Sequence, residues 1–193
     1  MTLIVFSKGK LYADNCILDT RDLANMQFST AKKVTVIENK MAIAFMGQEP
    51  RKRDRDNAVR AIAFNIAQME LTDKMDWFRS DDENAWSTKE AFEKTFPRTN
   101  TSYIIATKKS LYHFHHDEII TIDRNREFAD GSGATMYSMC RRAGLTVLQA
   151  YAEVSSFDHM VGKEVTTVDT KDFIDLKQAM EEEQKLKAKE VSA

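Results

Sequence analysis

The sequence has little cysteine, proline or glycine, and the scarcity of each residue excludes some classes of protein. Cys16 and Cys140 are the only cysteines among 193 residues, they form no CxxC pair, and no secretory signal accompanies them. This usage favours a reducing, cytoplasmic setting over an oxidising one. Two prolines and six glycines are few for this length. We therefore expect a chain dominated by regular helices and strands.

Long hydrophobic runs and an excess of one charge are also missing. The apolar stretch at residues 3–6 is far too short for a signal sequence or a membrane span, and no other stretch approaches that length. The formal net charge of -2 argues against a protein dominated by binding to nucleic acid or anionic membranes. We expect a soluble globular protein with neither kind of partner.

The hydrophobic pattern indicates blocks of strands that alternate with blocks of helices. Alternating or short apolar runs predict strands at residues 2–7, 11–14, 33–38, 41–46, 101–107, 110–115, 118–123 and 164–168. Helical spacing predicts a long helix from Arg51, a shorter one near 89–95, two more at 134–142 and 147–157, and a charged helix from Asp172. Residues 129–133 are expected to form a loop. This order predicts an α+β fold with antiparallel sheets, in one domain over 1–172 with a helical tail over 173–193.

Thr2 is the candidate nucleophile. It follows Met1 directly and opens the first apolar strand. Removal of Met1 would give one residue both a hydroxyl nucleophile and a free α-amine that can act as its base. We expect no propeptide and therefore expect activation to depend on loss of Met1 alone, which a small second residue generally permits.

Several segments behind Thr2 occur in an order typical of one family. They are Tyr12-Ala13-Asp14, Ala31-Lys32-Lys33-Val34, Phe45-Met46-Gly47, residues 130–137 (DGSGATMY), residues 145–150 (LTVLQA) and residues 157–162 (FDHMVG). With these segments the chain resembles the proteasome β-subunit superfamily of N-terminal-nucleophile hydrolases, which includes the bacterial proteasome-like peptidases. The resemblance extends to about Asp169. It implies a four-layer αββα sandwich of two antiparallel sheets flanked by helices.

The resemblance also implies a catalytic role for particular residues. Lys33 would lower the pKa of the Thr2 amine and stabilise a developing alkoxide, and Asp14 would hold the Lys33 ammonium in place. Ser132 and Asp158 match positions that orient the N-terminal amine and its proton transfers.

Further implications concern the substrate and the assembly. The backbone N–H of Gly47 would stabilise the oxyanion, and Phe45 and Met46 would line an apolar pocket for the residue before the cut. The implied substrate is a peptide or unfolded protein, cut inside a homo-oligomeric ring or stacked rings with an unfoldase or cap partner. No cofactor and no metal are expected.

Two departures from the family pattern keep other functions open. Val161 stands where the family motif has a serine, and valine neither donates nor accepts a side-chain hydrogen bond. The first hairpin is also about four residues shorter than usual, and only an even shortening of each strand keeps Asp14 on its original face. A catalytically silent assembly protein and a small-molecule amidohydrolase of the same fold therefore remain alternatives.

Two other motifs have plainer interpretations. His113, His115, His116 and Asp117 resemble a metal cluster, but at most two histidines and one acid of a strand and its turn can converge, so an exposed hairpin end is favoured. Gly131-Ser132-Gly133 lacks the lysine of a GxxxxGK phosphate loop, which disfavours phosphate binding.

Overall fold

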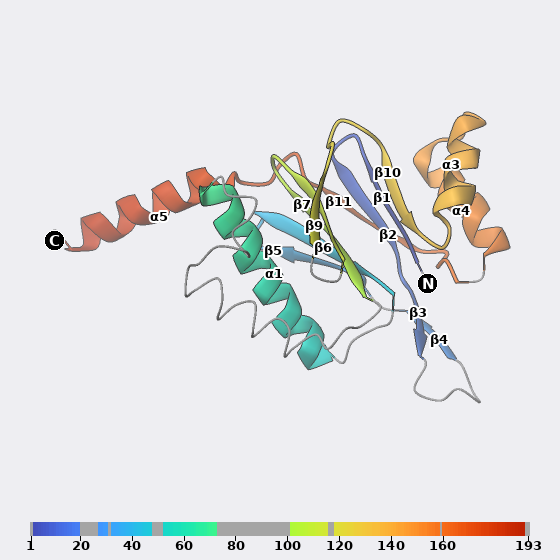
Figure 1. Ribbon diagram of the computed structural model, residues 1–193, viewed down its shortest axis with the longest axis horizontal. Helices are drawn as coiled ribbons and strands as arrows, with labels where there is room; N and C mark the ends of the chain where they lie inside the picture. Colours follow the sequence, from blue (N-terminus) through green and yellow to red (C-terminus); the bar gives the residue numbers. More distant parts are fainter. Residues whose placement is uncertain are drawn as a thin grey trace.

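Two β-sheets stacked between helices form the body of the protein in a computed structural model (Figure 1). The structure describes residues 2–19, 27–30, 32–47, 52–72, 101–115, 118–158 and 160–191. The helix predicted near 89–95 and the residues His116 and Asp117 lie outside these ranges.

The first sheet is antiparallel and has the strand order β10-β1-β2-β11. Its strands are β1 (Leu3–Ser7), β2 (Lys10–Asp14), β10 (Phe128–Gly131) and β11 (Val165–Asp169). Lys8 and Gly9 both have positive φ, 52° and 80°, as a tight turn between twisted strands requires. The prediction of a loop over 129–133 is wrong for its first three residues, because β10 pairs with β1 from Phe6↔Phe128 to Leu3↔Gly131.

The second sheet is an antiparallel meander with the order β5-β6-β7-β8-β9. Its strands are β5 (Val34–Ile37), β6 (Met41–Met46), β7 (Ser102–Thr107), β8 (Leu111–His115) and β9 (Glu118–Ile122). Every residue of β6 and β7 is buried, because these central strands have a packed layer on each face. A separate two-stranded ribbon, β3 (Cys16–Asp19) with β4 (Gln27–Thr30), was not predicted from the sequence.

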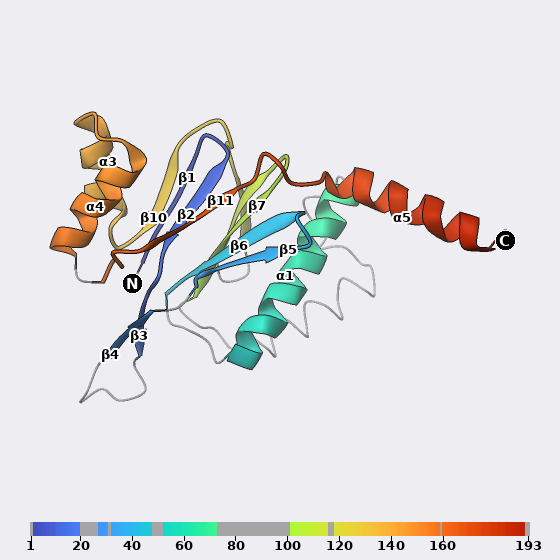
Figure 2. The same ribbon diagram turned by 180° about the vertical axis from the view of Figure 1, so that it is seen from behind.

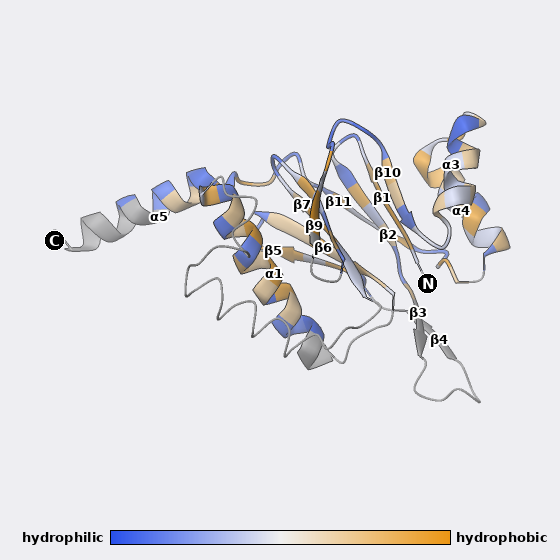
Figure 3. Cartoon of the chain, in the orientation of Figure 1, coloured by the Kyte–Doolittle hydropathy of each residue, from blue (hydrophilic) through white to orange (hydrophobic). Residues whose placement is uncertain are grey.

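The helices complete four layers. They are α1 (Lys52–Thr72), α3 (Ala134–Arg142), α4 (Val147–Phe157) and α5 (Leu176–Val191). In Figures 1 and 2, α3 and α4 cover the outer face of the first sheet, and α1 covers the outer face of the second. One apolar cluster fills each interface between layers, and Figure 3 shows the apolar residues along the strands of both sheets. The predicted αββα sandwich is confirmed.

Local sequence signals set the ends of α3 and α4. Gly144 follows α3 with φ +91°, a conformation that favours glycine. Thr146 caps α4 in a reciprocal capping box with Gln149. None of the described helices combines the length and the apolar character needed to cross a membrane.

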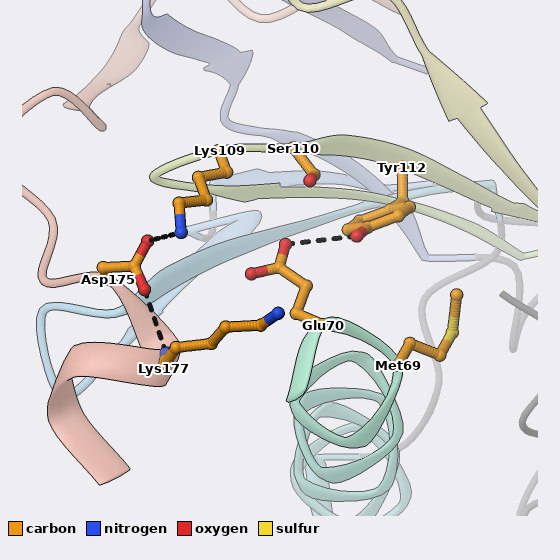
Figure 4. A pocket seen from close by; sticks show the side chains of 7 residues that line it. All are labelled: Met69, Glu70, Lys109, Ser110, Tyr112, Asp175 and Lys177. Carbon is orange, nitrogen blue, oxygen red and sulfur yellow. Dashed lines mark hydrogen bonds and ion pairs between the residues drawn. The ribbon is translucent and has the colours of Figure 1, made fainter. Parts of the chain in front are cut away.

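Helix α5 begins later than predicted, because Asp175 is its N-cap. The Asp175 carboxylate accepts hydrogen bonds from the backbone N–H groups of Lys177 and Gln178, and it pairs with Lys109 at 2.6 Å. Beside this cap lies a cavity of about 280 Å³, where the Tyr112 hydroxyl donates to Glu70 at 3.1 Å (Figure 4). Several of the polar groups that line the cavity thus bind one another and join α5 to the body of the protein.

The segment before α5 belongs to the core. Phe173 is 2% exposed and lies in the apolar cluster between the two sheets. Leu176 is buried in the cluster beneath α1. The division of the chain at residues 172 and 173 stays a prediction, and these contacts define a test of it.

We expect Phe173→Ala to lower the free energy of unfolding by about 3–5 kcal/mol, because it empties a fully buried aromatic site. Phe157→Ala is the matched control, since Phe157 is 66% exposed, and it should change stability by less than about 0.5 kcal/mol. Urea unfolding of both variants measures the difference. Equal effects would show that residue 173 lies outside the folded domain.

Candidate active site

A buried carboxylate, that of Asp14, is the centre of the candidate site. Asp14 is fully buried at the end of β2. The Thr2 hydroxyl donates to its Oδ2 at 2.6 Å, and the Lys33 ammonium donates to its Oδ1 at 2.8 Å. Thr2 precedes β1 of the first sheet, whereas Lys33 precedes β5 of the second. The structure therefore brings together three predicted site residues from both sheets.

Backbone amides complete the coordination of this carboxylate. The N–H of Leu3 donates to Oδ2 at 2.7 Å, while the N–H groups of Cys16 and Gly162 donate to Oδ1 at 2.8 and 3.1 Å. A buried carboxylate is costly unless its oxygens are paired and hydrogen-bonded. Here both oxygens accept several donors, which fixes the orientation of Asp14.

The Thr2 hydroxyl lies between a base-like and an acid-like group. It donates to Asp14 and accepts a hydrogen bond from the Lys33 ammonium. The Lys33 backbone is held in turn, because its carbonyl accepts from the Phe45 N–H at 3.1 Å and so extends the β5–β6 ladder. An ammonium placed against a hydroxyl oxygen stabilises negative charge that develops there. This geometry suits an activated oxygen nucleophile.

The end of β10 packs closely against Thr2. Gly131 has φ +103°, and a Cβ at this position would lie 2.0 Å from the Thr2 carbonyl oxygen, so only glycine fits. The register Leu3↔Gly131 brings the next residue, Ser132, to the level of Thr2. The Ser132 hydroxyl donates to the Asp158 carboxylate at 3.0 Å. The two remaining predicted catalytic residues thus form a pair of their own near the Thr2 backbone.

Val161 has a packing role. It is 2% exposed and lies in the apolar cluster between the first sheet and the helices α3 and α4. A Cβ on Gly133 would come within 3.1 Å of its Cγ2 atom, so Gly133 leaves room for the valine methyl group. The following residue, Gly162, passes so near Cys16 that its own Cβ would lie 2.7 Å from the Cys16 nitrogen. This close approach places the Gly162 N–H within hydrogen-bond distance of the Asp14 carboxylate.

Phe45, Met46 and Gly47 lie at the end of β6. Phe45 is buried in the cluster beneath α1, with the Arg55 guanidinium 5.9 Å from its ring centre. Met46 is buried in the cluster between the sheets, because successive strand residues face opposite sides. Gly47 is exposed and has φ +95°. The two side chains do not share one face, and the roles of all three residues in binding stay predictions.

Sequence reasoning missed Tyr151, which supports the site from behind. Its hydroxyl, on α4, lies 2.6 Å from the Leu3 carbonyl oxygen and 3.0 Å from that of Tyr12. Burial, together with the charge of Asp14, raises the pKa of Tyr151 well above its ordinary value, so the hydroxyl stays a donor. A tyrosine on an amphipathic helix is an ordinary core residue, and nothing in the pattern distinguishes one that binds strand carbonyls.

The described residues contain no group of three or more histidines, cysteines or acids that could hold a metal ion. His113 and His115 lie near each other on β8, with ring centres 5.9 Å apart, and His113 faces Asp130. His116 and Asp117, the rest of the cluster considered from the sequence, lie outside the described residues.

The fold is that of the proteasome-like N-terminal-nucleophile hydrolases. The likeness is one of structure alone, since no protein-family model matches the sequence and a search of curated proteins found no match. Two antiparallel sheets lie between helices, and the candidate nucleophile stands at the head of the first strand.

Solved structures share this fold. The chain is similar to eukaryotic HslV from Trypanosoma brucei, with 16% identity, a TM-score of 0.53, and coverage of 86% of this chain and 97% of that one. It is also similar to a Gly-1 mutant of Anbu from Hyphomicrobium sp. strain MC1, with 14% identity, a TM-score of 0.55 and full coverage of both chains. At these identities the likeness establishes the fold.

We expect Lys33→Met to lower the free energy of unfolding by about 3–5 kcal/mol, because it leaves the Asp14 charge buried without its cationic partner. Lys32→Met is the matched control on the adjacent, exposed residue, and it should change stability by less than about 0.5 kcal/mol. Guanidinium unfolding measures both. A Lys33→Met variant as stable as the control would contradict the coupling of Lys33 to Asp14.

Proposed function

We propose that the protein is a threonine peptidase that hydrolyses peptide bonds through the Thr2 hydroxyl. One observation carries the proposal: the Thr2 Oγ lies at the head of β1 between the Asp14 carboxylate and the Lys33 ammonium, and all three side chains are buried. A hydroxyl requires an adjacent base and a stabilised anionic form to act as a nucleophile. This arrangement supplies the second requirement, and a free amine on Thr2 would supply the first.

The proposed reaction begins when removal of Met1 frees the α-amine of Thr2. The amine takes the Oγ proton as Oγ attacks the carbonyl carbon of the scissile peptide bond. Lys33 stabilises the charge on Oγ, and Asp14 keeps Lys33 in place. The tetrahedral intermediate collapses as the C–N bond breaks, and the leaving amine takes the proton. Water then hydrolyses the ester on Thr2 and restores the hydroxyl.

The remaining predicted residues serve this reaction from either side of Thr2. We assign the Gly47 N–H to the oxyanion, because it follows β6 at the end of the sheet from which Lys33 comes. We assign Ser132 and Asp158 to the orientation of the Thr2 amine, which the register of β10 on β1 supports. Phe45 and Met46 keep their proposed role in an apolar pocket.

The substrate and the assembly are proposed by analogy with the fold. We infer a peptide or unfolded protein as substrate, a homo-oligomeric ring or stacked rings in the cytoplasm, and an unfoldase or cap partner. An enclosed degradative chamber requires a closed ring.

A second candidate function is a catalytically silent assembly protein of the same fold. The burial of Val161 favours it, because the position that would carry a serine hydroxyl is part of an apolar core. In that case the ion pair of Asp14 and Lys33 serves only to join the two sheets.

We expect protein made in its own host to lack Met1 by intact-mass measurement, and to cleave fluorogenic peptides. Thr2→Ala should reduce cleavage to background and abolish labelling by threonine-directed covalent inhibitors, because it removes the attacking oxygen. Thr2→Ser is the matched control, since it keeps a hydroxyl and should retain labelling. Retention of Met1 throughout the population, or equal cleavage by Thr2→Ala, would refute the peptidase.

A further inference from the structure

His113 and Asp130 face each other across the two sheets. His113 lies on β8 and Asp130 on β10, and the imidazole Nε2 is 3.5 Å from the carboxylate Oδ2. The ring also packs on Phe128, with centres 6.1 Å apart. Phe128 and Asp130 are two residues apart on one strand, so they present one face to His113. A titratable side chain of one sheet thus contacts two residues of the other.

The contact is incomplete as a hydrogen bond. A distance of 3.5 Å exceeds the usual 2.7–3.2 Å. Nε2 is buried and has no hydrogen-bond partner within the part of the chain that the structure describes. Burial lowers the pKa of His113 below its ordinary value, Asp130 raises it, and His115 lowers it. Ile104 and Ile120 are the neighbours of His113 on the adjacent strands. Among the residues that the structure describes, Asp130 and His115 are therefore the titratable groups that act on the ring.

Asp130 connects this contact to the Thr2 site. Its other oxygen, Oδ1, accepts the N–H of Gly131 at 2.6 Å. Gly131 in turn lies against the Thr2 carbonyl, where no Cβ would fit, and Ser132 follows it. A displacement of the Asp130 carboxylate therefore moves the peptide that packs on Thr2. These contacts form one continuous path from His113 to the proposed nucleophile.

We propose that His113 is a positioning residue for the Thr2 site. Protonation of its ring draws the Asp130 carboxylate towards the second sheet and changes the placement of Gly131 and Ser132 beside Thr2. A charge-assisted hydrogen bond is shorter and stronger than a neutral one, so the gained proton shortens the contact. The inference rests on the proposed function for its catalytic consequence, but the structural coupling stands apart from it.

NMR titration of the full-length protein tests the coupling without reference to activity. We expect the amide signals of Gly131 and Ser132 to titrate with the same midpoint as the His113 ring. In Asp130→Asn the ring midpoint should move to lower pH and the titration of both amides should disappear. Asp123→Asn is the matched control, because it removes an equal charge from an exposed position, and it should leave both titrations unchanged. The proposal would be overturned if the two amide signals did not titrate with the His113 ring. Equal effects of Asp130→Asn and Asp123→Asn on the titrations would also overturn it.

A kinetic measurement separates this proposal from the proposed peptidase. His113→Gln keeps a polar side chain at this position, but the glutamine amide cannot take up a proton in the pH range in which histidine titrates. We expect it to remove the His113-dependent step from the pH profile of kcat and to leave KM unchanged. A wild-type pH profile retained by His113→Gln would count against positioning. If the wild type cleaves no peptide at any pH, the peptidase fails, and the amide titrations still decide the role of His113.

Discussion

The buried carboxylate of Asp14 is the interaction on which the rest of the structure depends. Its oxygens accept hydrogen bonds from a hydroxyl, an ammonium and three backbone amides, which come from four separate segments of the chain. These donors stabilise the site because a charge left unpaired in this buried position would cost several kcal/mol. The hairpin β1–β2, the start of β5 and the loop after α4 are therefore fixed relative to one another by a single side chain.

Close backbone approach is the second constraint. At Gly131 and Gly162 a methyl group would overlap neighbouring backbone atoms, at 2.0 and 2.7 Å. At Gly131 the close approach places a peptide group directly against Thr2, and at Gly162 it brings a backbone N–H within hydrogen-bond distance of Asp14. Val161 directly precedes Gly162 and is buried in the apolar cluster beneath α3 and α4, so packing holds this loop where a serine hydrogen bond would otherwise do so.

Much of this arrangement follows from the sequence. The period of a strand explains why Asp14 keeps its face when the hairpin is shortened evenly, and the helix caps at Gly144 and Thr146 are local signals. Strand β10 was missed because Phe-Ala-Asp-Gly shows no alternation and forms a strand only by pairing with distant β1. The same holds for Phe173, whose burial between the sheets depends on tertiary packing within a mostly polar segment. Tyr151 was missed because it binds backbone carbonyl groups, which every residue has and which a sequence pattern therefore cannot indicate.

The bond between Lys33 and Asp14 has a consequence for how such chains diverge. Because either residue alone would be a buried, uncompensated charge, neither is free to change first, whether or not the chain still performs chemistry. A lineage that lost its catalytic function would keep both residues for as long as it kept the two sheets together. Thr2 carries no charge, so its replacement leaves no buried charge without a partner. Among related sequences, the presence of the threonine therefore indicates that the reaction is retained. The presence of the ion pair indicates only that the fold is retained.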